Sequence, residues 1–316
     1  MTYVTGGLVQ AADYNGFNGN LNVVWNTSYG QSATANVAIG NTVNANSWAN
    51  LNTNLSNAAS HQGTSITTRT NPQTGNIIAV LSNLGNDIAT INTNKLNAAT
   101  QGSQFTGWTG NASALTGAGS GNSAWTITFT DTITFANANA ASYFFNAGST
   151  VKIQFSKTST GNTADTPWNT LVNTTCGNIF LSSDASSKVI NGVTYTGTTK
   201  IGGNGAPHTL ATSTGFNQLT STPTVIYQQY ASGYVYSGDY VKVTAAYVPP
   251  VLTFVTTWHS PTGNSNVNIS GGTATTGITF GTAPATVVTY FPPETTHLAN
   301  VWGTPTVAST VATSLV

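Results

Sequence analysis

The sequence predicts an α+β protein, with a helical N-terminal region that includes a candidate short coiled coil, followed by antiparallel, β-sandwich-like structure. Three observations predict this class. Apolar residues recur three and four positions apart up to about residue 98. From about Trp108 they alternate with polar residues in short segments rich in Thr, Val, Ile and aromatics, separated by Gly, Asn, Pro and Ser. Only 4% of the 316 residues are charged, whereas 39% are hydrophobic, which is ample material for buried cores.

Two helices are predicted before residue 64. Each shows apolar side chains at alternating spacings of three and four, as one face of an amphipathic helix requires. The first stripe comprises Tyr14, Phe17, Leu21 and Val24, and the second comprises Trp48, Leu51, Leu55 and Ala58. Asn41-Thr42 offers an N-cap for the second helix, and residues 30–40 and 61–63 are expected to form connecting turns.

A third helix carries the spacing of a coiled-coil seam. Its apolar residues alternate spacings of four and three: Ile77, Leu81, Leu84, Ile88 and Ile91. Mixed Leu and Ile at these positions, with uncharged flanking positions, favour a coiled coil of three helices over one of two. These five residues are therefore the predicted oligomer interface of a homotrimer. The alternative is an ordinary amphipathic helix packed within its own chain, because the seam spans fewer than four heptads.

The remaining chain is predicted to form antiparallel strands of a sandwich-like domain. Apolar residues alternate with a period of two in segments 125–135, 151–155 and 234–243. Residues 168–172 are expected to form a short helix or turn packed on the sheet. Pro249-Pro250 is predicted to end the domain, because two prolines remove donors from a continuing ladder. The division is therefore 1–100 for a helical anchoring or oligomerisation region, 101–248 for a β domain, and 249–316 for a small C-terminal β or irregular region.

The scarcity of charge limits the chemistry that the chain can perform. Seven Lys and Arg balance seven Asp and Glu, so the net charge is zero and binding to nucleic acid or anionic membranes is not expected. Acids, bases and metal ligands are few, so we expect a non-enzymatic protein without a cofactor. No apolar run is long enough for membrane insertion. Cys176 is the single cysteine, which excludes an intrachain disulfide and predicts a small buried side chain.

Few residues are candidates for a chemical site. Glu294 and His297 are three apart, the spacing of ligands on one helical face, but without a second cluster the pair more often forms a cap or hydrogen bond. His61, His208 and His259 are scattered and have no acid next to them in sequence, so they indicate no triad. Residues 202–205 resemble a phosphate loop only superficially and are expected to be an ordinary loop.

Tyrosines gather between residues 227 and 247. Aromatic faces beside Asn and Gln amides suit carbohydrate contacts, and Tyr234 and Tyr236 are the candidates for contact with a host glycan. The same alternation is typical of ordinary strand residues, and core packing is the competing interpretation.

Several stretches together resemble a known group of proteins. They are GLVQAADYNGF at 7–17, GNTVNANSWANL at 40–51 and HQGTSI at 61–66, then YFFNAG at 143–148 within 135–155, YSGDYVKV at 236–243, TGITFG at 276–281 and YFPPETTHLANVWGTP at 290–305. They are similar to structural proteins of tailed bacteriophages, especially those of cyanobacteria and other aquatic hosts. The resemblance implies a virion component, often tail-fibre-like, and brings no catalytic residues.

The residues and the resemblance predict the same role. We expect a trimeric tail-fibre or tail-appendage subunit that contacts copies of itself, other virion proteins and a host surface glycan. It would reside in the virion after assembly in the host cytoplasm. The alternatives are a capsid decoration or neck protein and, from another class, a carbohydrate-active tailspike enzyme, which would need carboxylates converging in a groove.

Overall fold

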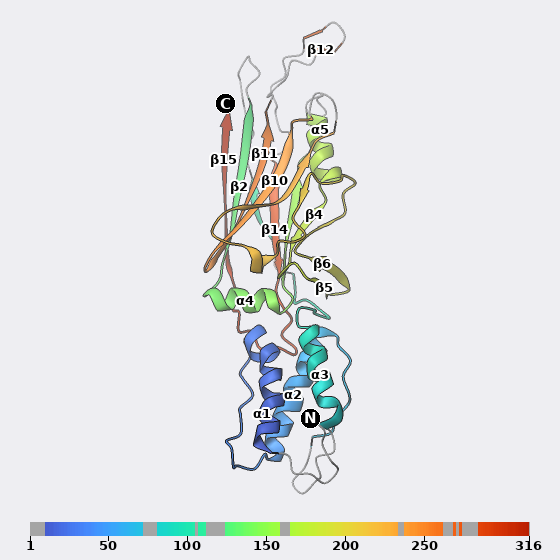
Figure 1. Cartoon of the computed structure of the whole chain (residues 1–316). Coiled ribbons are helices and arrows are strands. Elements are labelled where there is room, and N and C mark those ends of the chain that lie inside the picture. Colours follow the sequence, from blue (N-terminus) through green and yellow to red (C-terminus); the bar gives the residue numbers. More distant parts are fainter. Residues whose placement is uncertain are drawn as a thin grey trace.

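The computed structural model has a helical region at one end and a β region at the other (Figure 1). It describes residues 10–71, 81–104, 107–111, 124–158, 165–232, 237–261, 268–269, 272–273 and 284–315. Helices and antiparallel sheets together confirm the predicted α+β class.

The helical region contains α1 (Ala11–Asn22), which continues into the π-helical turn η1 (Val23–Ser28), then α2 (Ala45–Gln62) and α3 (Leu81–Thr93). The N-cap of α2 is Asn44 rather than the predicted Asn41-Thr42, since its side chain accepts a hydrogen bond from the Ser47 N–H at 2.9 Å. The link between α1 and α2 is tied down by amides: Asn15 makes two 2.8 Å hydrogen bonds to the backbone of Val37. Side-chain amides, rather than charged groups, thus hold this link against α1.

The described residues of the predicted oligomer interface pack against helices of the same chain. Leu84, Ile88 and Ile91 are no more than 2% exposed and belong to the same core cluster as residues of α1 and α2. Because α1 and α2 already bury this face of α3, we do not assign these residues to a subunit interface. The arrangement is the alternative considered from the sequence, an amphipathic helix packed within its own chain. Ile77 lies outside the described residues, as does the side chain of Leu81.

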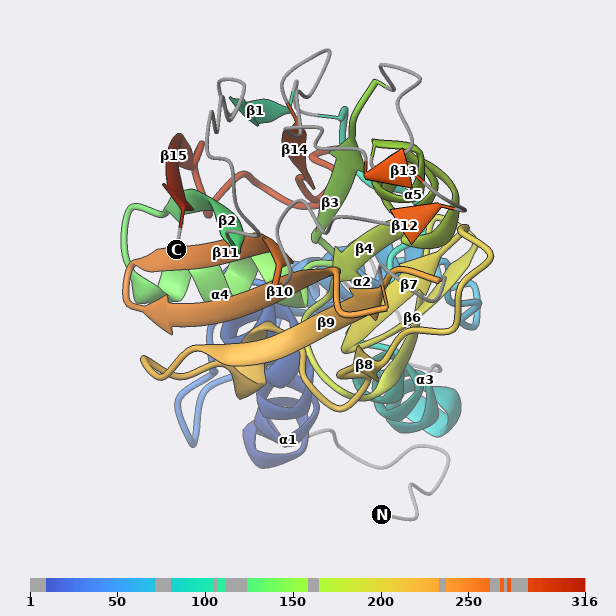
Figure 2. The ribbon, with the colours of Figure 1, turned by 90° about the horizontal axis from the view of Figure 1, so that it is seen from above.

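The β region is built on two antiparallel sheets (Figure 2). The five-stranded sheet has the order β1 (Trp108–Asn111), β14 (Ala285–Phe291), β3 (Thr150–Ser156), β4 (Asn178–Leu181) and β7 (Thr198–Ile201). The six-stranded sheet has the order β15 (Thr306–Leu315), β2 (Trp125–Thr134), β11 (Val251–Ser260), β10 (Tyr240–Val248), β9 (Thr224–Tyr230) and β8 (Thr209–Leu210). Two small hairpins are added, β5 (Ser187–Ile190) with β6 (Val193–Thr196) and β12 (Asn268–Ile269) with β13 (Gly272–Thr273).

Aromatic side chains fill the space between the sheets. Phe155 of β3 stacks on Tyr227 of β9, with ring centroids 6.2 Å apart. The predicted helix at 168–172 is present as α5 (Asp165–Thr170), which continues into η2 (Leu171–Thr175). Its Trp168 stacks on Trp258 of β11 at 5.8 Å and contacts Trp125 of β2 at 4.9 Å. Two further helical segments, α4 (Ala138–Asn146) and the 3-10 turn η3 (Phe216–Gln218), meet where Phe145 stacks on Phe216.

Residues 249–316 are not a separate region. Pro249-Pro250 forms the two-residue turn of the hairpin from β10 to β11, where Val248 is paired with Val251. The strands after this turn then enter both sheets, β11 between β2 and β10, and β14 between β1 and β3. The prolines end one strand without ending the domain, since a tight turn needs no ladder donors.

Candidate functional site

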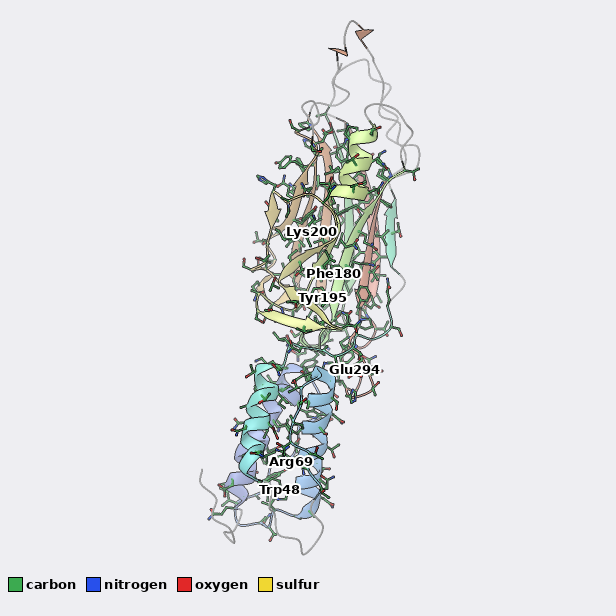
Figure 3. The ribbon with its side chains drawn as sticks, turned by 90° about the vertical axis from the view of Figure 1, so that its right-hand side faces the viewer. Trp48, Arg69, Phe180, Tyr195, Lys200 and Glu294 are labelled. Atoms are coloured by element: carbon green, nitrogen blue, oxygen red, sulfur yellow. The ribbon has the colours of Figure 1, made fainter. Side chains whose placement is uncertain are left out.

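A cluster of His61, Glu294 and His297, of which His61 and Glu294 are buried, lies where the helical and β regions meet. His61 belongs to the last turn of α2, which ends because Gly63 adopts a left-handed C-cap with φ of 66°. Glu294 lies in the turn after β14, and its Oε2 accepts hydrogen bonds from the N–H groups of Thr296 and His297. Figure 3 shows Glu294 at the level where the helices end and the sheets begin.

A single carboxylate oxygen is shared by the two imidazoles. Oε1 of Glu294 lies 2.9 Å from Nδ1 of His61 and 3.2 Å from Nδ1 of His297. His61 and Glu294 are 1% and 6% exposed, whereas the His297 side chain is 35% exposed. The buried pair therefore joins two regions across 233 residues of chain.

Glu294 is held in its charged form. Burial alone would raise its pKa, but the hydrogen bonds from His61 and from the backbone of His297 and Thr296, with the attraction of His61, outweigh burial and lower the pKa to about 2. The contact to His61 is consequently a charge-assisted hydrogen bond, which is stronger than one between neutral groups. The ring of Tyr29 packs edge-on against His61 at 5.1 Å.

Glutamine amides make a second set of contacts beside the cluster. Gln31 both donates to the Ala299 carbonyl at 3.0 Å and accepts from the Ala299 N–H at 2.9 Å. Gln62 donates to the hydroxyl of Tyr29 at 2.9 Å, and that hydroxyl donates to the carbonyl of Lys95 at 2.8 Å. These side chains are buried, so water competes poorly for their partners.

The chain that leaves α3 is bonded to the β region by its backbone. Ala98 donates to the carbonyl of Val189 at 3.0 Å and accepts from Asn191 at 2.9 Å, which places it beside the β5–β6 hairpin. Ala98 packs with Phe180 and Tyr195 in a small cluster of its own. Gly102 then donates to the carbonyl of Pro292 at 2.7 Å. We call the contacts of His61, Gln31, Ala98 and Gly102 with the β region the junction.

The geometry of the cluster suits a structural contact better than a metal centre. The two Nδ1 atoms face the same carboxylate oxygen at hydrogen-bond distance, so each imidazole is engaged by Glu294. Among the described residues, no group of three or more His, Cys, Asp or Glu side chains is arranged to hold a metal. Glu294 and His297 are hydrogen-bonded to each other, as one interpretation of their spacing expects. His61 was missed as its partner because no local signal links residues so far apart in sequence.

The other sequence candidates lie in separate places. His208 packs against Tyr230 at 5.1 Å, and His259 lies 2.9 Å from the hydroxyl of Thr126. Tyr234 and Tyr236, the candidates for glycan contact, lie outside the described residues. The predicted loop at 202–205 is present, and Gly203 packs tightly against the backbone of Gly177.

Core packing accounts for one member of the tyrosine-rich stretch. Tyr227 is fully buried and donates to the carbonyl of Cys176 at 3.0 Å. Cys176 is buried as predicted, and burial raises its pKa to about 12, so it remains a neutral thiol.

Two aspartates are buried in the β region. Asp131 on β2 and Asp239 before β10 are 0% and 1% exposed. Burial raises the pKa of each to about 6. Ser309 and Trp108 lie close enough to Asp131 to oppose this rise in its pKa. Among the described residues, however, neither carboxylate oxygen of Asp131 has a partner in good hydrogen-bond geometry. Both side chains thus carry a desolvation cost when ionised.

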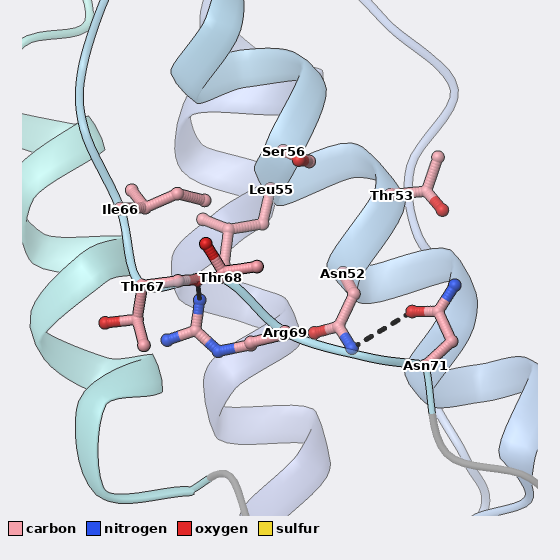
Figure 4. A pocket seen from close by; sticks show the side chains of 9 residues that line it. All are labelled: Asn52, Thr53, Leu55, Ser56, Ile66, Thr67, Thr68, Arg69 and Asn71. Atoms are coloured by element: carbon pink, nitrogen blue, oxygen red, sulfur yellow. Dashed lines mark hydrogen bonds between the residues drawn. The ribbon is translucent and has the colours of Figure 1, made fainter.

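One pocket lies in the helical region and another at the junction. One, of about 270 Å³, lies between α2 and segment 66–71, and its lining includes Asn52, Ser56 and Arg69 (Figure 4). Arg69 is paired with Asp87, so this pocket offers no free charge. The other, of about 340 Å³, lies at the junction and is lined by Tyr290, Trp302 and segment 292–293 among others.

Comparison with known proteins gives no relative. No protein-family model, curated protein or solved structure matches the chain. In the part of the chain that the structure describes, no helix is long and apolar enough to cross a membrane.

Proposed function

We propose that the protein is a structural component of a tailed-bacteriophage virion, serving as a tail-fibre or tail-appendage subunit without catalytic activity. The observation that carries the proposal is the junction, which fixes a helical region and a β region end to end through buried polar contacts. A subunit of an extended appendage must hold its two regions in a fixed relative orientation, and buried polar contacts of this kind do so. The resemblance of stretches in both regions to phage structural proteins supports the same role.

Six of the seven acidic residues, those whose side chains the structure describes, are occupied in ways that suit a structural role. Glu294, Asp87 and Asp184 pair with His61, Arg69 and Lys188. Asp131 and Asp239 are buried, and Asp13 accepts from the N–H of Gln10 at the start of α1. A tailspike glycosidase needs two carboxylates free to act on one bond. The structural proposal is therefore preferred over the carbohydrate-active enzyme.

We class the two sheets as a β-sandwich-like domain because Phe155 and Tyr227 stack between them and both sheets contribute to one core cluster. The helical region is proposed to anchor the subunit to other virion proteins, and the β region to project from the particle.

Purified particles of the phage that encodes the chain provide the test. We expect peptides of the chain in washed virions by mass spectrometry, and antibody label on the tail in electron micrographs. Label on the capsid or neck would move the chain to the alternative structural position. Abundant chain in infected cells with none in the particles would contradict the proposal.

Host attachment is the part of the proposal that involves Tyr234 and Tyr236. If they stack on a surface glycan, Tyr234→Ala and Tyr236→Ala should abolish binding of the protein to host cells while leaving the melting temperature unchanged. Tyr227→Ala is the matched control for a core tyrosine and should lower the melting temperature. Undiminished binding by both variants would show that these tyrosines do not contact the glycan, and no cell binding by the wild type would restrict the role to assembly.

A further inference from the structure

The longest exposed sheet edge in the described part of the chain is β15. It pairs with β2 over ten consecutive residues, from Thr306 opposite Thr134 to Leu315 opposite Trp125, without a bulge. Among the described residues it has no second strand neighbour. Its outer edge is therefore a row of backbone donors and acceptors available to another strand.

β15 lacks the features that usually protect an edge. Residues 306–315 contain no charged residue and no proline, and they are rich in Thr and Val, which favour strands. The other edges are short, with four residues in β1, four in β7 and two in β8. Among the outer strands of the two main sheets, β1, β7 and β8 are thus too short to pair with much of another strand, whereas β15 is not.

The nearby strand β1 does not cover this edge. Gly110 of β1 packs over the inner face of β15, where an added Cβ would lie 2.6 Å from Oγ of Ser309 and 3.5 Å from Val311. Its backbone is paired instead with β14 of the other sheet. β1 therefore closes the core beneath β15 and leaves the edge open.

We propose that β15 pairs with β15 of a second copy of the chain, antiparallel across a two-fold axis, so that the two six-stranded sheets become continuous. A second copy fits because the strand is self-complementary. With the axis at Thr310, exposed Ala308 lies opposite Ala312 of the second copy, and half-buried Val311 lies opposite half-buried Ser309. The strand is uncharged and the chain has no net charge, so no repulsion opposes the approach.

Lysines on the exposed face of the edge test the pairing. Wild-type protein is compared with Ala308→Lys/Ala312→Lys by sedimentation at about 100 µM, a concentration suited to weak interfaces. We expect twice the chain mass of 32.5 kDa for wild type. The variant should associate at least about tenfold more weakly, because each introduced Lys faces a like charge. Thr310→Lys is a second variant, which places one lysine opposite itself on the axis.

The matched control is Thr222→Lys/Thr224→Lys, which adds the same charge at exposed positions near β9, away from β15. It should associate like wild type. Far-ultraviolet circular dichroism checks that every variant folds, and hydrogen exchange should slow in residues 306–315 as wild-type concentration rises. A monomeric wild type, or equal association by the edge variants and the control, would overturn the pairing. Neither result bears on whether the chain is found in virions.

Discussion

At the scale of single residues, Glu294 is a buried carboxylate that its hydrogen-bond partners hold in the charged form. Replacement by Gln keeps its size but removes the charge that His61 and two backbone N–H groups favour. We expect Glu294→Gln to lower the free energy of unfolding by about 2 kcal/mol, measured by urea denaturation at pH 7. His297→Gln removes the exposed imidazole and should cost clearly less. Equal losses of unfolding free energy in the two variants would show that the contact between His61 and Glu294 adds no stability of its own.

The pH dependence of this contact follows from its lowered pKa. The pKa of Glu294 falls from 4.5 to about 2 on folding, so its stabilisation is fully present above pH 4.5 and is lost as pH falls toward 2. The Glu294→Gln variant should lack this acid loss. Melting temperatures measured between pH 2 and 5 check the expectation, and parallel curves for wild type and variant would contradict it.

Asp131 has the opposite dependence. Its pKa rises from 3.8 to about 6 on folding. The stability that comes from preferential protonation of the folded state is therefore fully present below pH 3.8 and is lost as the pH rises through 6. Above that pH, the ionised side chain of Asp131 lowers the free energy of unfolding by roughly 3 kcal/mol. Asp131→Asn should therefore be more stable than wild type at pH 7, by about 1 kcal/mol after the amide's own burial is counted. Denaturation of both proteins at pH 4 and pH 7 decides, and a variant less stable at both would contradict the argument.

At the scale of elements, α3 shows how much the sequence could indicate. The spacing of Leu84, Ile88 and Ile91 correctly predicts a helix with one buried face. Spacing carries no information about what covers that face, because α1 of the same chain and α3 of another subunit would bury the same side chains. The short seam, with fewer than four heptads, was the one signal that favoured the chain's own helices.

A truncation in α3 distinguishes an intrachain core from a subunit interface. Ile88→Ala should lower the free energy of unfolding by about 2–4 kcal/mol through the cavity it leaves, while the mass in solution stays that of wild type. Asn86→Ala, at an exposed position of the same helix, should change neither. If Ile88→Ala changed the mass at full stability, the side chain would belong to an interface after all.

The strands show the same division between local and distant information. Alternation in segments 125–135 and 151–155 predicts β2 and β3 because each has one face in the core. The partners of β11 and β14 depend on pairing between distant segments, which alternation cannot specify. The sequence therefore predicts a boundary at Pro249-Pro250, although the two prolines form the turn between two adjacent strands. His61 and Glu294, likewise, meet only through the complete fold.

At the scale of the whole molecule, the lack of charge sets how the protein associates. The proposed β15 pairing uses backbone hydrogen bonds and uncharged side chains, so salt has few ion pairs to screen. The dissociation constant should change less than about threefold between low salt and about 0.5 M sodium chloride. Sedimentation at both ionic strengths checks this, and dissociation by salt alone would contradict an uncharged interface.

The central claim is that the junction makes the helical and β regions one body. The measurement that tests it most directly is native-state hydrogen exchange, comparing amides of α2 with those of β2 and β11 across a urea series. Since the junction couples the two regions, both sets should open with the same free energy and the same urea dependence in wild type. Glu294→Gln should lower both together. Exchange of α2 at a much lower free energy than the sheets, unchanged by Glu294→Gln, would contradict the claim.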